Sequence, residues 1–290
     1  MDHVKHWDDE GGEAVVRLRT GAVGVLLGLT VWCLPLAAFA ELSAAEIAAK
    51  VYNLEGGEDS ISRLSFSLQR PDGSEKKLIY TMVWKEYEGK DDVDDKAIFF
   101  SEFPPDDKGK SFMVWVYDNK SPDEWMYLPE LRMVRKVTHS EGHRHHDEDD
   151  DYAHSVLTQV VLVPRDPGLD THTLVGSEEI DGSSAYVVDS VPKQASKNYP
   201  YGKTRRWISK DNFLPERTDY YGESGAVEKH LTIKWKRIGD AWVWEQVVGV
   251  DLRTKDRTVL DISDIRLNNE LEDEVFSART MRLGKDSVMR

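Results

Sequence analysis

The sequence has a single cysteine, no surplus of basic residues and no recognisable motif of an enzyme active site. Cys33 lies in a segment that we expect to be removed, which excludes a disulfide, a Cys-based zinc site and a thiol nucleophile from the mature chain. Lys and Arg number 38 against 53 Asp and Glu, giving a formal net charge of −15. A nucleic-acid partner is therefore excluded, because neutralising phosphates requires clustered basic residues.

The motifs of nucleophilic catalysis are also missing. The chain contains no Gly-x-Ser-x-Gly elbow and no glycine-rich phosphate loop. Acidic pairs such as Glu178 and Glu179 are common in an acidic sequence, and solvated strand or turn faces account for them. The sequence therefore predicts a protein that is not an enzyme and that needs no cofactor.

The one long apolar run lies near the N-terminus. Residues 21–40 carry no charge, follow the basic residues Arg17 and Arg19, and end with the small residues Ala38 and Ala40. This pattern is typical of a secretory signal peptide and predicts cleavage after Ala40 and export to the periplasm. A membrane anchor is the alternative reading, because about 20 apolar residues can span a bilayer.

Residues 41–290 are expected to form a single domain, since no linker divides them and 40% of the 290-residue chain is hydrophobic. Ser43 and Glu46 have the spacing of a capping box. Ile47, Ala48 and Val51 follow at helical spacing, which predicts a short amphipathic helix at the start of the domain.

The remainder of the domain alternates apolar and polar residues with a period of two, which indicates β-strands. Leu64 to Leu68 and Leu78 to Trp84 flank the turn Arg70-Pro71-Asp72-Gly73 and predict a hairpin. Further strands are expected at 97–103, 111–117, 124–128, 131–138, 172–179, 184–191, 204–209, 213–220, 227–237, 241–251 and 256–265. Closely spaced hairpins predict a mainly β, antiparallel sheet, and a sheet of this length must curve or close.

Two strongly charged stretches interrupt this pattern. Residues 85–96 are expected to be a charged loop or hairpin tip. Residues 139–151 are rich in His and Asp, and their low complexity predicts a mobile loop. His143, His145 and His146 could bind a divalent metal, but adventitious binding or none at all is the alternative, because such tracts lack fixed geometry.

Aromatic residues and methionines are concentrated in the first half of the expected sheet. One sheet face rich in such residues can pack against a helix as an ordinary core, or it can leave a concave apolar cavity. The pattern alone leaves both readings open.

Several segments resemble one known family. Phe103-Pro104 through Val137 contains the stretch Trp125-Met126-Tyr127-Leu128-Pro129, which is the most specific part of the resemblance. Arg205-Arg206-Trp207-Ile208-Ser209 and Thr258-Val259-Leu260 fit the same family, as do Ile233-Lys234-Trp235 and Phe276-Ser277-Ala278-Arg279. Over nearly the whole mature chain, the sequence resembles the outer membrane lipoprotein-sorting proteins, relatives of the LolA and LolB lipoprotein carriers.

This resemblance implies an open antiparallel half-barrel, with a few helices covering its concave face, and an apolar pocket for acyl chains. It also implies a non-enzymatic periplasmic carrier of lipidated proteins or other hydrophobic ligands that serves an inner-membrane transporter of the resistance-nodulation-division (RND) type. The pocket lining is expected at alternate positions of the early strands: Phe66, Leu68, Tyr80, Met82, Trp84, Phe100, Trp115, Tyr127 and Met133. Within one strand the pleat makes Tyr80, Met82 and Trp84 share a face, whereas the sequence does not determine how the strands are aligned with one another.

A function of another class also fits the residues. The His/Asp-rich tract would suit a metal-binding accessory protein that acts through His143, His145 and His146. Native mass spectrometry of protein purified from its own compartment separates the two hypotheses, because the carrier retains lipid and the accessory protein retains stoichiometric metal.

Deleting residues 140–151 is predicted to leave the melting temperature almost unchanged, because a polar, low-complexity tract has little surface to bury. Thermal unfolding in metal-free buffer, followed by circular dichroism, measures this. A drop of many degrees would show that the tract packs against the domain.

Overall fold

The computed structural model describes residues 42–87, 89–117, 120–137, 155–195 and 199–289, all of which belong to one compact unit. The expected signal peptide and the His/Asp-rich tract at 139–151 lie outside these residues. No helix in the described part of the chain is both long and apolar enough to cross a membrane.

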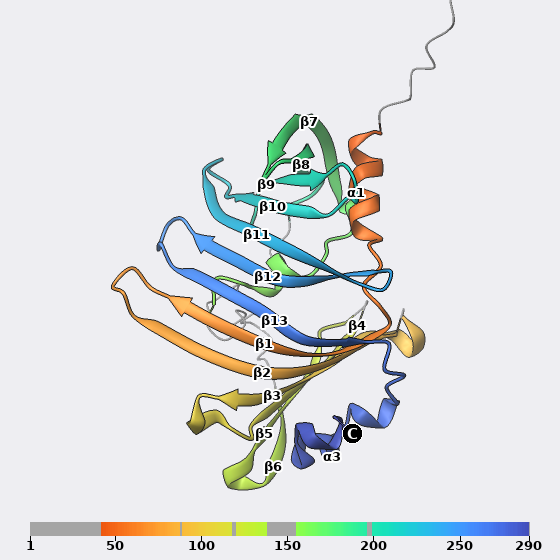
Figure 1. Ribbon diagram of the computed structural model, residues 1–290, viewed down its shortest axis with the longest axis vertical. Helices are drawn as coiled ribbons and strands as arrows, with labels where there is room; N and C mark the ends of the chain where they lie inside the picture. The colour runs from red at the N-terminus through yellow and green to blue at the C-terminus, as the bar shows by residue number, and fades with distance from the viewer. Residues whose placement is uncertain (1–41, 88, 118–119, 138–154, 196–198, 290) are drawn as a thin grey trace, which may run out of the picture. The chain divides into compact units, whose positions relative to one another are not determined.

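A single curved antiparallel sheet dominates the fold (Figure 1). Its 13 strands have the order β6-β5-β4-β3-β2-β1-β13-β12-β11-β10-β9-β8-β7, so that β6 and β7 form the two edges and the sheet does not close. The strands are β1 (Asp59–Gln69), β2 (Glu75–Glu86), β3 (Val93–Phe103), β4 (Ser111–Tyr117), β5 (Asp123–Leu128), β6 (Met133–Val137), β7 (Asp170–Ile180), β8 (Ser183–Pro192), β9 (Lys203–Ser209), β10 (Pro215–Tyr221), β11 (Val227–Ile238), β12 (Ala241–Asp251) and β13 (Arg257–Leu267). The predicted mainly β, open antiparallel fold is confirmed.

Two strands that are consecutive in the chain, β6 and β7, lie at opposite edges of the sheet. β1 pairs with both β2 and β13, so the first and last strands lie side by side in the middle of the sheet. β1 to β6 run outward to one edge, whereas β7 begins at the other edge and β7 to β13 run back to the centre. The connection from β6 to β7 must therefore cross a face of the sheet.

The helix α1 (Ala44–Tyr52) begins where the sequence predicts. Ser43 accepts a hydrogen bond from the Glu46 backbone N–H, and the Glu46 carboxylate accepts one from the Ser43 backbone N–H, which completes the capping box. The buried side of the helix, with Ile47 fully buried, packs against Val188 of β8 and Ile208 of β9. We call the side of the sheet that α1 covers the α1 face.

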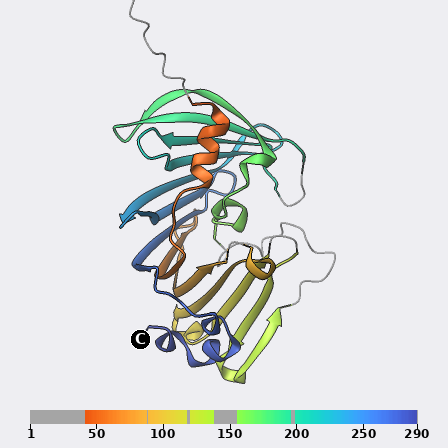
Figure 2. The same ribbon diagram turned by 90° about the vertical axis from the view of Figure 1, so that its right-hand side faces the viewer.

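The C-terminal segment, which contains α3 (Ala278–Leu283), packs at the other end of the sheet (Figure 2). Phe276 and Met281 contact Ile98 and Met113 in a second hydrophobic core. Tracing directly opposed residues from strand to strand shows that this core lies on the other side of the sheet, which we call the α3 face. Figure 1 nevertheless draws both helices on the right, because the strand twist accumulates across the sheet.

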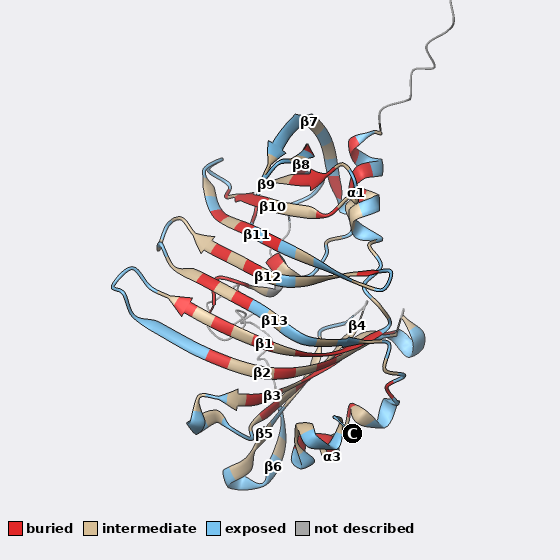
Figure 3. Ribbon diagram, viewed as in Figure 1, coloured by how far each residue is buried: buried red, intermediate tan, exposed pale blue. Residues whose placement is uncertain are grey.

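β2 and β3 bury residues on both faces of the sheet, where Figure 3 colours them red and tan. In β2, Val83 is fully buried in the core beneath the C-terminal segment, and its neighbour Met82 packs against the core of the α1 face. Two-sided burial explains why these strands carry apolar residues at both parities rather than at one.

The expected charged loop or hairpin tip at 85–96 is half strand. β2 continues to Glu86 and β3 starts at Val93, and the tip of the β2–β3 hairpin lies between them. Lys96 is 7% exposed and lies 4.2 Å from the ring centroid of Tyr87 and 4.3 Å from that of Trp115. Cation–π contact with two rings stabilises this buried ammonium, so a lysine here does not mark a loop.

Replacing Phe276 with Ala should lower the free energy of unfolding by about 3–5 kcal/mol, because Phe276 is 2% exposed and its removal leaves a cavity between the C-terminal segment and the sheet. The matched control is Leu283→Ala in α3. Leu283 is 60% exposed, so its replacement should change stability by less than about 0.5 kcal/mol. Urea unfolding measures both, and equal effects would mean that the segment is not docked as described.

Candidate functional site

The nine residues expected to line a pocket are divided between the two faces of the sheet. Leu64 opposes Tyr80, and Ser62 opposes Met82, so β1 and β2 present their even-numbered residues together on the α1 face. On this face lie Phe66, Leu68, Tyr80, Met82, Trp84 and Met133. On the α3 face lie Phe100, Trp115 and Tyr127.

The three residues of the α3 face belong to the core beneath the C-terminal segment. Phe100 is 4% exposed, and the rings of Trp115 and Trp125 meet edge to face at 5.3 Å. A shared surface of all nine residues is therefore excluded. Phe100 faces away from Tyr80 and Met82 because it pairs with Thr81 of β2. This register follows a bulge between Ile79 and Tyr80.

On the α1 face, the centre of the sheet forms a closed core. Phe66 and Leu68 are 4% and 7% exposed, and the Phe66 ring packs edge to face against Tyr80 at 6.2 Å. Leu260 of β13 and Val247 of β12 continue the same apolar layer.

A segment of the crossing connection, residues 155–162, covers this core. It contains α2 (Gln159–Leu162) and buries Leu157 completely among the core residues. Gly249 provides the room, because a Cβ atom there would lie 2.7 Å from a methyl carbon of Leu157. The sheet at this place is thus shaped to receive a leucine side chain.

Buried polar side chains hold this segment by its backbone. The Val156 N–H donates to Thr258 Oγ1 at 2.9 Å, and Lys229 Nζ donates to the Val156 carbonyl at 2.8 Å. The Tyr220 hydroxyl donates to the Val161 carbonyl at 3.3 Å. The apolar contacts of the segment are therefore supplemented by hydrogen bonds in a buried place, where leaving a polar group unpaired is costly.

Towards β6 the α1 face becomes more accessible and is mainly apolar, with Arg135 of β6 opposite Met126 and in contact with the Met133 sulfur. Six side chains form what we call the β2–β6 strip: Met82, Trp84, Phe99, Phe112, Met126 and Met133. Met126 and Met133 are 41% and 42% exposed, whereas Met82, Trp84, Phe99 and Phe112 are half-buried. Such a surface can take up apolar chains, because methionine and aromatic side chains adapt to irregular shapes.

The sequence analysis missed Phe99, Phe112 and Met126 as members of this surface. Phe99 and Phe100 are adjacent and both aromatic, so alternation could not decide which of them faces the strip. In the structure Phe99 opposes Phe112, with ring centroids 6.4 Å apart.

A half-buried carboxylate borders the strip at Trp84. Burial, together with the nearby charges of Asp94 and Glu86, raises the pKa of Asp95 to about 6, and a hydrogen bond from the Trp84 side chain opposes the rise. Around neutral pH, Asp95 is therefore ionised at a cost to the folded state.

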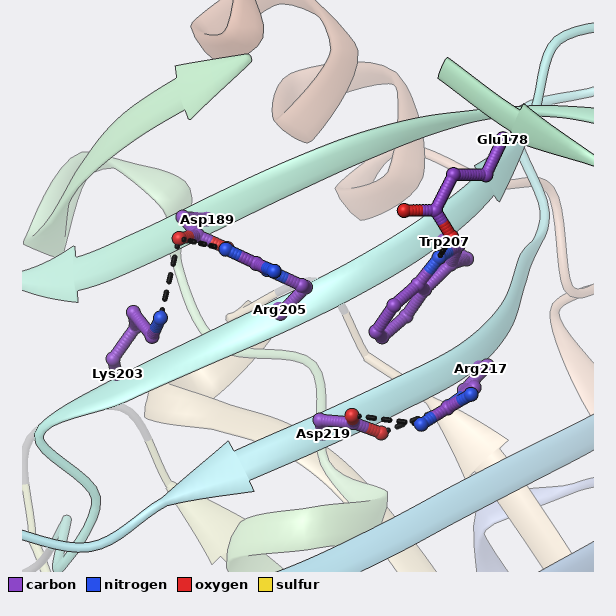
Figure 4. Close-up of polar contacts among 7 residues, drawn as sticks. All are labelled: Glu178, Asp189, Lys203, Arg205, Trp207, Arg217 and Asp219. Carbon is purple, nitrogen blue, oxygen red and sulfur yellow. Dashed lines mark hydrogen bonds and ion pairs between the residues drawn. The ribbon is translucent and has the colours of Figure 1, made fainter. Parts of the chain in front are cut away.

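Polar pairs occupy the α3 face of β7 to β11 (Figure 4). Arg205 donates two hydrogen bonds to Asp189, at 2.6 and 2.9 Å, and Arg217 donates two to Asp219, both at 2.9 Å. The bonds from Arg205 hold the pKa of Asp189 below its ordinary value. Arg217 also lies 4.4 Å from the Trp207 ring centroid. The pair of Asp189 and Arg205 joins β8 to β9, and the pair of Arg217 and Asp219 lies within β10, so these charges are matched on the sheet itself and have a structural role.

A charged cavity opens on the α1 face. Its volume is about 280 Å³. Its lining comes from the segment 155–162, the residues before β9, the start of β11 and the end of β12 with the turn after it: Thr158, Pro200, Tyr201, Glu228, Lys229, Asp251 and Arg253. None of the nine expected pocket residues lines it.

The metal hypothesis concerns residues outside the described part of the chain, where His143, His145 and His146 lie. Within the described ranges, no three His, Cys, Asp or Glu side chains are grouped closely enough to hold a metal ion. Metal binding by the tract stays a prediction.

Comparison with known proteins agrees with this geometry. A family model described as an "Uncharacterized protein"-like family matches residues 93–283. The chain belongs to that family. None of the curated proteins matches the chain.

Three solved structures share the fold. A DUF1329 family protein from Desulfovibrio piger is 23% identical, with a TM-score of 0.69 over 82% of this chain and 97% of that one. An outer membrane lipoprotein-sorting protein domain from Vibrio parahaemolyticus is 24% identical, with a TM-score of 0.67 over 82% and 98%. A LolA superfamily protein from Nitrosomonas europaea is 19% identical, with a TM-score of 0.56 over 83% and 100%. At these identities the likeness establishes the fold, and the expected LolA-like half-barrel is confirmed.

Asp95→Asn should stabilise the protein above pH 6 and not at pH 3. Because the folded pKa of about 6 lies above the ordinary value of 3.8, the wild type loses stability as the pH rises between these values. Allowing for partial solvent access, we expect a gain of about 1–2 kcal/mol at pH 8. Urea unfolding at both pH values measures it, with the fully exposed Asp240→Asn as control. A gain that does not change with pH would contradict this assignment.

Proposed function

We propose that this protein is a periplasmic carrier or chaperone that binds the acyl chains of lipidated proteins, or other hydrophobic ligands, without catalysing a reaction. The proposal includes export by the signal peptide at 1–40. The observation that carries it is the β2–β6 strip, an accessible apolar surface that continues a buried core on the same face of the sheet.

The energetics suit a carrier. Each methylene group transferred from water to an apolar surface gains about 0.8 kcal/mol, so an acyl chain on the strip is held without any specific polar contact. Met82, Met126 and Met133 contribute flexible side chains that can follow chains of different shape. Such a site favours a class of ligand rather than one molecule.

The segment 155–162 gives the proposed site a way to adjust its capacity. Leu157 and Val161 belong to the core cluster against which Tyr80 and Met82 pack. A ligand chain that replaced these two side chains would gain their contacts, at the cost of the hydrogen bonds that Thr258 and Lys229 make to Val156. The bound state would then differ from the empty one mainly in this segment.

The family resemblance extends the proposal to a partner, an inner-membrane transporter of the RND type that would supply or receive the cargo. The metal-binding accessory role is the alternative function, and native mass spectrometry for retained lipid or metal separates the two.

Met82→Asp should reduce binding of a fluorescent fatty acid by at least tenfold, because an unpaired carboxylate on the strip must be desolvated when an acyl chain covers it. Fluorescence titration measures the affinity. Met126→Asp should have the same effect on binding, and Met126 is 41% exposed, so this variant keeps the fold.

The matched control is Ile79→Asp, which places the same charge at a half-buried position of β2 on the α3 face. It should leave probe binding unchanged. Normal binding by folded Met82→Asp and Met126→Asp proteins would contradict the proposed site.

A further inference from the structure

The charged cavity lies at the rim of the apolar layer of the α1 face. Residues that oppose one another on neighbouring strands form rows across this face. One such row is apolar and consists of Ile233, Val247, Leu260 and Phe66. The next row towards this rim contains Leu231, Gly249, Thr258 and Leu68, and the row beyond it brings Lys229 opposite Asp251. Polarity therefore rises stepwise from the closed core to the cavity, as it does along an amphiphilic molecule.

The cavity is also continuous with the core through shared residues. Tyr201 lines the cavity and belongs to the core cluster, where its ring lies 4.7 Å from that of Tyr220. Thr158, in the lining, directly follows Leu157, which is buried in the cluster. A molecule in the cavity would thus sit next to the segment that fills the apolar face.

The lining offers both signs of charge. Arg253 and Lys229 contribute a guanidinium and a buried ammonium, while Glu228 and Asp251 contribute two carboxylates. Among the described residues, neither the Glu228 carboxylate nor the Arg253 guanidinium has a hydrogen-bond or ion-pair partner.

A tyrosine hydroxyl adds to the lining. The Tyr201 side chain is largely buried, at 7% exposed, and burial raises the pKa of its hydroxyl. This hydroxyl makes no hydrogen bond within the described part of the chain and is not among its fully buried unpartnered atoms, so it is available to a molecule in the cavity.

We infer that this cavity binds a zwitterionic group that combines a phosphate with a primary ammonium, such as the phosphoethanolamine headgroup of a lipid. Arg253 and Lys229 pair with the phosphate, since a guanidinium presents a fork of donors to its oxygens. Glu228, Asp251 and the Tyr201 hydroxyl accept from the ammonium. The inference deepens the proposed function, on which it rests for the adjacent acyl chains, and it names the headgroup class.

The test is isothermal titration calorimetry with dihexanoylphosphatidylethanolamine, a soluble lipid, against dihexanoylphosphatidylglycerol, which lacks the ammonium. The wild type should prefer the ethanolamine lipid by at least fivefold. Glu228→Gln should abolish this preference, and Arg253→Gln should weaken both lipids at least fivefold. Both side chains are exposed, so both variants should fold. Glu223→Gln and Lys255→Gln, exposed controls outside the lining, should behave as the wild type.

Glycerophosphoethanolamine, which carries no acyl chains, separates the two sources of the same chemistry. Binding at least tenfold weaker than that of the lipid assigns the cavity to a lipid headgroup, and equal binding assigns it to a free zwitterion. Both results support the site.

Equal affinity of the wild type for the two lipids, or unaltered binding by both lining variants, overturns the inference. A protein that binds the fluorescent fatty acid but none of the headgroup probes overturns it while the carrier function stands. Headgroup binding without fatty-acid binding has the opposite meaning, because it supports the cavity and contradicts the carrier.

Discussion

The pairing of β1 with β13 is the constraint on which the rest of the structure depends. It places the first and last strands at the centre of the sheet, so that the two halves of the chain finish and begin at opposite edges. One connection must then cross a face, and backbone that crosses an apolar face must bury its own polar groups. The hydrogen bonds from Thr258 and Lys229 to Val156 meet this requirement.

The crossing also determines where an apolar ligand could lie. Leu157 and Val161 complete the core at the centre of the sheet, while the β2–β6 strip on the same face stays accessible. The opposite face at that end has its own cover, because Phe276 and Met281 pack there. At that end of the sheet the accessible strip and the core beneath the C-terminal segment lie on different faces, so a variant at an exposed strip residue such as Met126 need not unfold the protein.

Charge is distributed to match this arrangement. On the α3 face Asp189 pairs with Arg205 of the neighbouring strand and Asp219 pairs with Arg217 of its own strand, whereas the cavity at the rim of the α1 face leaves Glu228 and Arg253 without partners among the described residues. Matched pairs cost little and reinforce the sheet, but unmatched charges of both signs in one cavity are suited to a ligand that carries both. The apolar layer and the charged rim together suit an amphiphile.

The sequence by itself determined the elements: the capping box at Ser43 starts α1, and alternation located all the strands of the sheet to within a few residues. It also determined that Tyr80 and Met82 share a face, because the pleat has a period of two. Only the tertiary structure decided that Phe100, Trp115 and Tyr127 face away from Met82, and that Lys96 belongs to a strand. The register between two strands decides which residues of each strand share a face, and a bulge such as that between Ile79 and Tyr80 changes it. Register and bulges arise from contacts between strands, which the sequence of one strand does not contain.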